Sequence, residues 1–148
     1  MQETVRVRAI LDRKGHDVWY LAPEATVYEA IALMAEKGIG ALPVISAGRL
    51  VGIISERDYA RKVILKGRLS RETRVYEIMT SPVITVTPDL KSDECMRIVT
   101  ERRIRHLPVV DGDRLVGVIS IGDLVKSIMS HQAEMIEQLT SYIEGRPL

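Results

Sequence analysis

The chain has 148 residues, 46% of them hydrophobic, which is enough apolar material for one domain with a buried core. Twenty-one Lys and Arg against 20 Asp and Glu leave a net charge of +1, so no overall field attracts a polyanion, and nucleic acid is not an expected partner. The one cysteine excludes an internal disulfide, Met1 to Thr4 lack the character of a signal peptide, and no apolar run reaches the roughly 18–20 residues of a membrane span, so we expect a cytoplasmic protein without a membrane partner.

An internal repeat organises the chain. Residues 23–61 align without gaps on residues 88–126, at a constant displacement of 65, with 14 identities in 39 positions. A duplication across a whole supersecondary unit indicates two copies of one fold element. Two halves of about 65 residues would each be marginal alone, so we expect them to share a core.

The first copy contains signals for each of its elements. Residues 5–16 hold a short alternating apolar run and a polar turn, and are expected to cover an edge. Thr26 and Glu29 stand at capping-box spacing and begin a helix that Gly38 ends. The other expected elements are a strand over 18–21, a β-hairpin formed by 39–45 and 49–55, and a second helix over 56–66 that stops at Gly67.

The second copy follows the same order. Residues 68–77 are polar and are expected to form an exposed linker, followed by a strand over 83–86, a helix in which Cys95 is a small core residue, and a hairpin formed by 105–110 and 114–120. The last helix continues from about Gly122 to Glu144 and so outruns its counterpart in the first copy. An excess of apolar helix surface is usually buried against another element, so a second subunit is expected there.

Several short segments occur in the same order in both copies. They are Ile39 to Val44 and Gly52 to Asp58 in the first, and Ile78 to Thr80, the helix after Pro88, Ile104 to Asp111 and Gly117 to Asp123 in the second. Together they resemble the successive signatures of the CBS domain, over roughly residues 5–130. The resemblance implies an α/β (α+β) fold of two repeated β-α-β-β-α motifs packed with pseudo-twofold symmetry. The expected organisation is a single module over 1–148, with repeats over 5–67 and 78–130, a linker over 68–77 and a helical extension over 131–148.

The two Ser-x-x-Asp motifs are the sharpest candidates for a site. From their residues alone, Ser55 with Asp58 and Ser120 with Asp123 are helix N-caps, because a serine oxygen accepts the first helical N–H groups and an aspartate favours the positive helix end. The resemblance implies a second role, in which both aspartates accept the hydroxyls of a ribose and both serines meet a phosphate. The two interpretations are compatible.

Arg105 and His106 stand where the first copy has Gly40 and Ala41. An exposed arginine on an edge strand is by default a solvated charge, whereas the resemblance implies that basic groups here reach the phosphates of a bound nucleotide. It also implies two clefts between the copies. The first would contain Asp58, Ser55, Arg57, Arg61, Thr80, Ser81, Val83, Arg105 and His106; the second would contain Asp123, Ser120, His16, Val18, Ile39, Gly40 and Ala41, with little positive charge.

Adenine needs apolar walls, and each candidate wall is equally explained as core. The candidates are Val83, Ile84, Ile54 and Pro108 for the first cleft, and Val18, Ile39, Ile119 and Pro43 for the second. The three histidines have no i, i+4 histidine partner and form no Cys/His cluster, so no metal site is expected.

The expected function is therefore a regulatory module. It would bind an adenosine nucleotide (AMP, ADP, ATP or NAD(H)), form a homodimer and signal occupancy to a regulated protein by conformational change. An enzyme is not expected, because the chain has no glycine-rich phosphate loop and no nucleophile elbow. The alternative is a ligand-free structural or dimerisation module that recruits a partner protein through its last helix.

Overall fold

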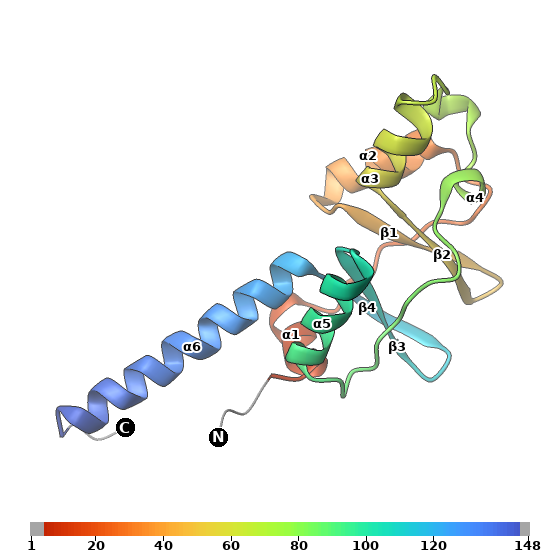
Figure 1. Cartoon of the computed structure of the whole chain (residues 1–148). Coiled ribbons are helices and arrows are strands. Elements are labelled where there is room, and N and C mark those ends of the chain that lie inside the picture. Colours follow the sequence, from red (N-terminus) through yellow and green to blue (C-terminus); the bar gives the residue numbers. More distant parts are fainter. Residues whose placement is uncertain (1–4, 146–148) are drawn as a thin grey trace.

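The structure is a computed structural model that describes residues 5–145; the ends of the predicted module, residues 1–4 and 146–148, lie outside this range. Its elements, in order, are α1 (Val7–Lys14), α2 (Val27–Lys37), β1 (Ala41–Ser46), β2 (Arg49–Ser55), α3 (Glu56–Tyr59) continued by the π-helix η1 (Ala60–Ile64), the 3₁₀ turn η2 (Ser70–Glu72), α4 (Val75–Ile78), α5 (Ser92–Arg102), β3 (His106–Asp111), β4 (Arg114–Ser120) and α6 (Ile121–Ile143). Figure 1 shows two similar halves whose hairpins lie toward each other, with helices outside. The predicted duplicated fold is confirmed.

Both predicted hairpins form with the same register. β1 pairs with β2 and β3 with β4, each antiparallel, and each pair has an irregularity at the same place, between Val44 and Ile45 and between Val109 and Val110. The predicted capping box is also present, since the Thr26 side chain accepts from the Glu29 N–H, and Gly38 ends α2 in the left-handed conformation.

The strands predicted over 18–21 and 83–86 are wrong in extent. Each is reduced to one residue bridged to its hairpin in parallel, Leu21 to Val44 and Val86 to Val109. The bridge at Leu21 uses the Pro43 carbonyl and the Ile45 N–H. Extending it two residues upstream would require an N–H from Pro43, which proline lacks. Pro108 limits the second bridge in the same way.

The segment before each repeat completes the core of the other half. Val75 and Ile78 are buried among the first hairpin and α2, whereas Val7, Ile10 and Leu11 are buried among the second hairpin, α5 and α6. Two glycines allow this close approach: a Cβ on Gly52 would lie 2.5 Å from Met79 Sδ, and one on Gly117 would lie 2.6 Å from Leu11 Cδ2. The expectation of one shared core is therefore wrong: each half has its own core, and the halves are interlocked because each core is completed by the segment that precedes the other repeat.

Two segments differ from expectation as a result. Residues 7–14 form a helix rather than an alternating edge segment, because its core contacts recur at Val7, Ile10 and Leu11, a helical spacing. Residues 68–77 are not wholly exposed: Thr73 and Val75 are buried, and the backbone at Thr73 and Val75 hydrogen-bonds to Val27 and Ala25.

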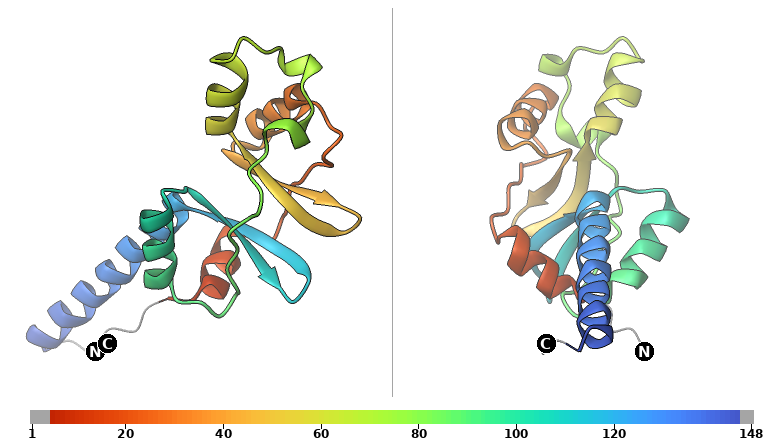
Figure 2. Two further views of the ribbon diagram at one scale, coloured as in Figure 1. Left: turned by 45° about the vertical axis from the view of Figure 1, so that its right-hand side comes forward. Right: turned by 90° about the vertical axis from the view of Figure 1, so that its left-hand side faces the viewer.

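The long last helix is confirmed. α6 begins at the second hairpin, and Figure 2 shows most of it extending away from both halves. Its exposed large apolar side chains are Ile121, Val125, Met129, Ile136, Leu139, Tyr142 and Ile143. Cys95 is buried in the second core as predicted, and burial, followed by the charges of Asp93 and Glu94, raises the pKa of its thiol to about 11.

Candidate functional site

Asp58 lies at the start of α3, where the sequence predicts a cap. The Ser55 hydroxyl accepts from the Asp58 N–H at 3.2 Å, and Asp58 Oδ2 accepts from the N–H and the hydroxyl of Ser55, both at 3.0 Å. The other oxygen, Oδ1, faces Thr80 Oγ1 at 3.3 Å and Lys62 Nζ at 2.9 Å. The capping interpretation is therefore confirmed, and the carboxylate is held in one orientation by both of its oxygens.

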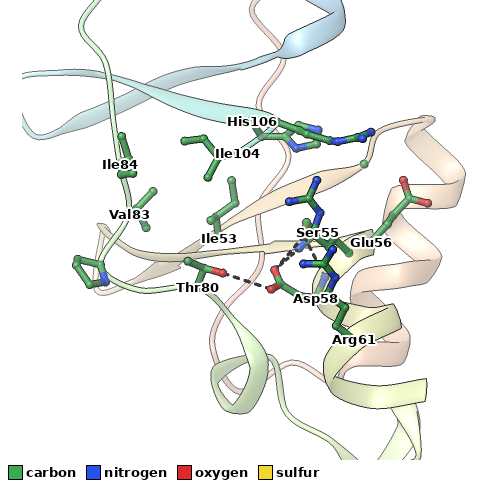
Figure 3. Close-up of a pocket in the computed structure, with 14 residues that line it drawn as sticks. Ile53, Ser55, Glu56, Asp58, Arg61, Thr80, Val83, Ile84, Ile104 and His106 are labelled. Atoms are coloured by element: carbon green, nitrogen blue, oxygen red, sulfur yellow. Dashed lines mark hydrogen bonds between the residues drawn. The ribbon is translucent and has the colours of Figure 1, made fainter. Parts of the chain in front are cut away.

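A cavity of about 450 Å³ opens beside this carboxylate. Its walls come from both repeats: Gly40, Ile53, Ser55, Glu56, Arg57, Asp58, Arg61, Thr80, Pro82, Val83, Ile84, Ile104, Arg105 and His106. In Figure 3, Asp58 and Thr80 point toward each other, while Ile53, Val83, Ile84 and Ile104 lie together at another part of the cavity. The cavity thus has a polar end and an apolar part.

Most residues predicted for the first cleft line this cavity. Ser81 is the exception; its neighbour Pro82 lines the cavity instead. Of the four predicted apolar walls, Val83 and Ile84 line the cavity. Ile54 and Pro108 are buried and do not line it, and Ile53 takes the place of Ile54. Side chains alternate along a strand, so Ile53 shares the side of Ser55 while Ile54 faces the core.

Positive charge collects in the cavity. Arg57, Arg61 and Arg105 all line it, together with one acidic side chain beside Asp58, that of Glu56. His106 does not add to this charge near neutral pH: burial, followed by the charge of Lys14, lowers the pKa of its imidazole. The expected basic pair at the start of β3 is therefore one charged guanidinium and one neutral imidazole.

Gly40 stands where a larger residue would crowd its neighbours. A Cβ there would lie 3.0 Å from Glu56 Oε1 and 3.4 Å from the ring of His106. Glycine therefore lets the first repeat approach His106 of the second. Gly40 was expected in the second cleft, and it lines the cavity at Asp58.

The residues predicted for the second cleft, around Asp123, differ widely in burial. The cap is present, with the Ser120 hydroxyl accepting from the Asp123 N–H at 3.1 Å. Ala41 is buried, Val18 and Ile39 are half-buried, and His16 is exposed, with its Nε2 3.0 Å from Asp12 Oδ1 of α1. Ile119, a predicted wall, is fully buried in the core.

Lys14 changes the charge at Asp123. Its Nζ lies 2.7 Å from Asp123 Oδ2 and 2.7 Å from the Val118 carbonyl oxygen. Burial raises the pKa of Asp123, but the hydrogen bonds from Lys14 and from the Ser120 N–H outweigh it, so the pKa is lowered overall. The expectation of little positive charge at this position did not include this lysine.

Sequence reasoning missed two lysines for different reasons. Lys62 stands four residues after Asp58 on the same helix, a spacing at which side chains meet, so the sequence contained the signal. Lys14 and Asp123 are 109 residues apart, and nothing local connects them.

Within residues 5–145, no group of three or more His, Cys, Asp or Glu side chains is arranged to hold a metal ion, and no helix in that range is long and apolar enough to cross a membrane.

Comparison with known proteins places these observations in a family. The sequence model of the CBS domain matches twice, at residues 7–65 and 75–130. CBSX3 of Arabidopsis thaliana, a CBS domain-containing protein described as mitochondrial, is 38% identical over 97% of this chain and 74% of its own length.

Solved structures agree with the fold. A protein with CBS domains from Burkholderia ambifaria superposes with a TM-score of 0.82 at 52% identity, covering 85% of this chain and 95% of that one. The CBS domain pair of MJ0100, solved with 5′-methylthioadenosine and S-adenosyl-L-methionine, has a TM-score of 0.77 at 27% identity (86% and 98% covered). A hexameric CBS-CP12 protein from bloom-forming cyanobacteria has a TM-score of 0.76 at 32% identity (84% and 72% covered). The chain belongs to the CBS-domain family, as a regulatory module made of a pair of CBS domains.

Proposed function

We propose that this CBS pair binds an adenosine nucleotide in the cavity beside Asp58 and signals its presence by a change in the arrangement of the two repeats. The observation that carries the proposal is the combination found in one cavity: a fixed carboxylate, three guanidiniums and an apolar wall. The adenosine compounds in the related MJ0100 structure support the same ligand class.

Each part of the cavity suits one part of a nucleotide. The two oxygens of Asp58 can accept the two hydroxyls of a ribose, with the Thr80 hydroxyl, which lies 3.3 Å from Oδ1, beside them. Ile53, Val83, Ile84 and Ile104 offer flat apolar contact to adenine. The guanidiniums of Arg57, Arg61 and Arg105 match phosphate oxygens, and three of them favour a polyphosphate over a monophosphate.

A nucleotide bound in this cavity can change the arrangement of the two repeats, because it contacts both of them. The cavity is lined by β2 and α3 of the first repeat and by two parts of the second repeat, namely Thr80 with residues 82–84 and residues 104–106. A ligand that contacts all three stabilises the arrangement in which they are closest, and it shifts the equilibrium by the difference in its affinity for the two arrangements.

Calorimetry with AMP, ADP, ATP, NAD and NADH tests the proposal. We expect binding of at least one of them, lost in Asp58→Ala and, in Arg105→Ala, weakened for ATP more than for AMP. Arg8→Ala is a matched control, because Arg8 pairs with Asp89 away from the cavity. Absence of binding by the wild-type chain to all five compounds would overturn the proposal.

We propose a homodimer in which α6 contacts α6 of a second copy. Val125, Met129, Ile136, Leu139 and Ile143 are exposed and fall at spacings of four, seven, three and four, which fits a heptad stripe. Light scattering should give the mass of a dimer for the full chain and a smaller mass after truncation at Ser130. A monomeric full chain would instead assign the stripe to a partner protein, and a hexamer would match the CBS-CP12 relative.

We also propose that the role is binding without catalysis, in the cytoplasm, and that nucleic acid is not a partner. The Asp58 carboxylate is engaged by the cap, and the three guanidiniums can only donate hydrogen bonds. Glu56 and His106 also line the cavity and are the groups through which turnover would have to proceed. Incubation of the chain with each nucleotide, followed by chromatography, should return the nucleotide unchanged, and turnover would contradict this role.

A further inference from the structure

The two Ser-x-x-Asp motifs share their serine and aspartate, but the side chains that contact the two aspartates differ. In the first half, Thr80 bridges two groups: its N–H donates to the Ile53 carbonyl at 2.8 Å, and its hydroxyl lies 3.3 Å from Asp58 Oδ1. In the second half, the counterparts of Ile53 and Asp58 are Val118 and Asp123, 65 residues later. Both of these are bridged by one ammonium group, that of Lys14.

The exchange of a hydroxyl for an ammonium changes what can bind. A hydroxyl can donate or accept, so Thr80 can turn toward a ribose hydroxyl in either sense. Lys14 Nζ can only donate, and it already donates to Asp123 Oδ2, which also accepts from the Ser120 N–H at 2.8 Å. A ribose hydroxyl approaching Asp123 therefore meets an ammonium that cannot accept from it, whereas one approaching Asp58 meets the Thr80 hydroxyl, which can.

Lys62 does not have this effect at Asp58, although it also contacts the carboxylate. It comes from the same helix, one turn on, is tied to the Ile78 carbonyl at 2.9 Å, and is not among the residues that line the cavity. Lys14 comes from a different element, α1, whose Leu11 is buried against Gly117 and so fixes where the lysine begins. Asp58 therefore lines a cavity that its lysine does not line, whereas the ammonium group at Asp123 comes from outside the second repeat. The difference lies in this group and not in burial, since the Asp123 side chain is 23% exposed and that of Asp58 is 10% exposed.

We propose that Lys14 determines the number of nucleotides bound: it occupies the ribose position at Asp123, so the chain takes one nucleotide, at Asp58, and removal of the Lys14 ammonium creates a second adenosine site. This inference rests on the proposed nucleotide function. Lys14 is thus a specificity-determining residue supplied by the segment that precedes the first repeat.

Titration of the wild-type chain and of Lys14→Met with adenosine and with AMP tests this. We expect one molecule per chain for the wild type, and two for Lys14→Met, of which one is lost when Asp123→Asn is added. Lys14→Gln is a second variant in case the methionine side chain fills the space. Arg13→Ala is the matched control, because it removes a positive charge from the adjacent position of α1, where Arg13 faces Glu134, and should leave one molecule per chain.

The outcomes separate the two proposals. Two molecules per chain in the wild type, one of them lost in Asp123→Asn, would overturn the role of Lys14 and leave the nucleotide function standing. One molecule per chain in the folded Lys14→Met and Lys14→Gln variants would also overturn it. No binding by any of the chains would overturn the nucleotide function itself. The position of Lys14 can also be tested without a ligand, because the charge of Lys14 lowers the pKa of the His106 imidazole. NMR titration of His106 should give a higher pKa in Lys14→Met than in the wild type, and Arg13→Ala should leave it unchanged.

Discussion

The duplication supplies a matched pair of substitutions, Asp58→Asn and Asp123→Asn. Each removes the negative charge from a capping box of the same form, and each also removes one lysine contact. Ser55 and Ser120 remain as N-caps, so the loss is that of a carboxylate beside the positive helix end, about 1 kcal/mol, and the ion pairs, whose lysines are 43% and 36% exposed, add about 0–1 kcal/mol. Both variants should therefore melt at similar temperatures, about 2–8 °C below the wild type.

Their effects on binding should differ sharply. In the proposed complex Asp58 accepts two ribose hydroxyls, and hydrogen bonds to a charged group contribute about 1.5–3 kcal/mol each. An amide keeps one acceptor oxygen, so Asp58→Asn should lose about 2–3 kcal/mol of binding free energy, or about 30- to 150-fold in affinity. Asp123→Asn should change the affinity by less than about threefold.

Calorimetry with AMP and ATP, alongside thermal unfolding of the same samples, measures both quantities. Equal losses of affinity in the two variants would refute the assignment of the ribose to Asp58, and so would an Asp58→Asn variant that binds as tightly as the wild type. The parallel melting data exclude unfolding as the cause of a difference.

Three further outcomes are expected. Leu11→Ala should lower the free energy of unfolding by about 3–5 kcal/mol in denaturant titrations, because Leu11 is buried in the second core; a loss below about 1 kcal/mol would contradict the interlocked packing. Since the pKa of His106 is lowered in the folded chain, the unfolded chain binds its proton more tightly, so stability should fall as the pH drops below 6.5 toward the folded pKa, and His106→Gln should reduce this dependence. ATP affinity should fall with added salt while adenosine affinity stays constant, because only the phosphates face the guanidiniums; equal salt dependence would place the phosphates elsewhere.

The parts of the fold that depend on local chemistry were predictable. The cap at Thr26, the stop at Gly38 and the two hairpins follow from neighbouring residues, and the displacement of 65 identified the duplication. The reduced strands were predictable in principle, since Pro43 and Pro108 remove the N–H groups that longer bridges need.

The interlocking of the halves was not found because it follows a different displacement. Val7 to Leu11 reads Val-x-x-Ile-Leu, and Val75 to Met79 reads Val-x-x-Ile-Met, 68 residues later. An alignment held at 65 residues cannot show this pair, and the burial of Val75 within a polar stretch has no local signal.

The lining of the candidate cavity was predictable where its residues lie within the repeat. Asp58, Thr80 and Arg105 meet at one cavity as the family resemblance implied, whereas Ile53 was mistaken for Ile54 by a shift of one residue along a strand. The contact between Lys14 and Asp123 depends on the tertiary path of α1, so only the structure could show it.

The most direct test of the nucleotide site is a crystal structure of the chain grown with ATP. The proposal predicts one nucleotide per chain in the cavity, with both ribose hydroxyls within hydrogen-bond distance of the Asp58 carboxylate and the phosphates on Arg57, Arg61 and Arg105. A ribose bound to Asp123, or a nucleotide outside this cavity, would contradict it.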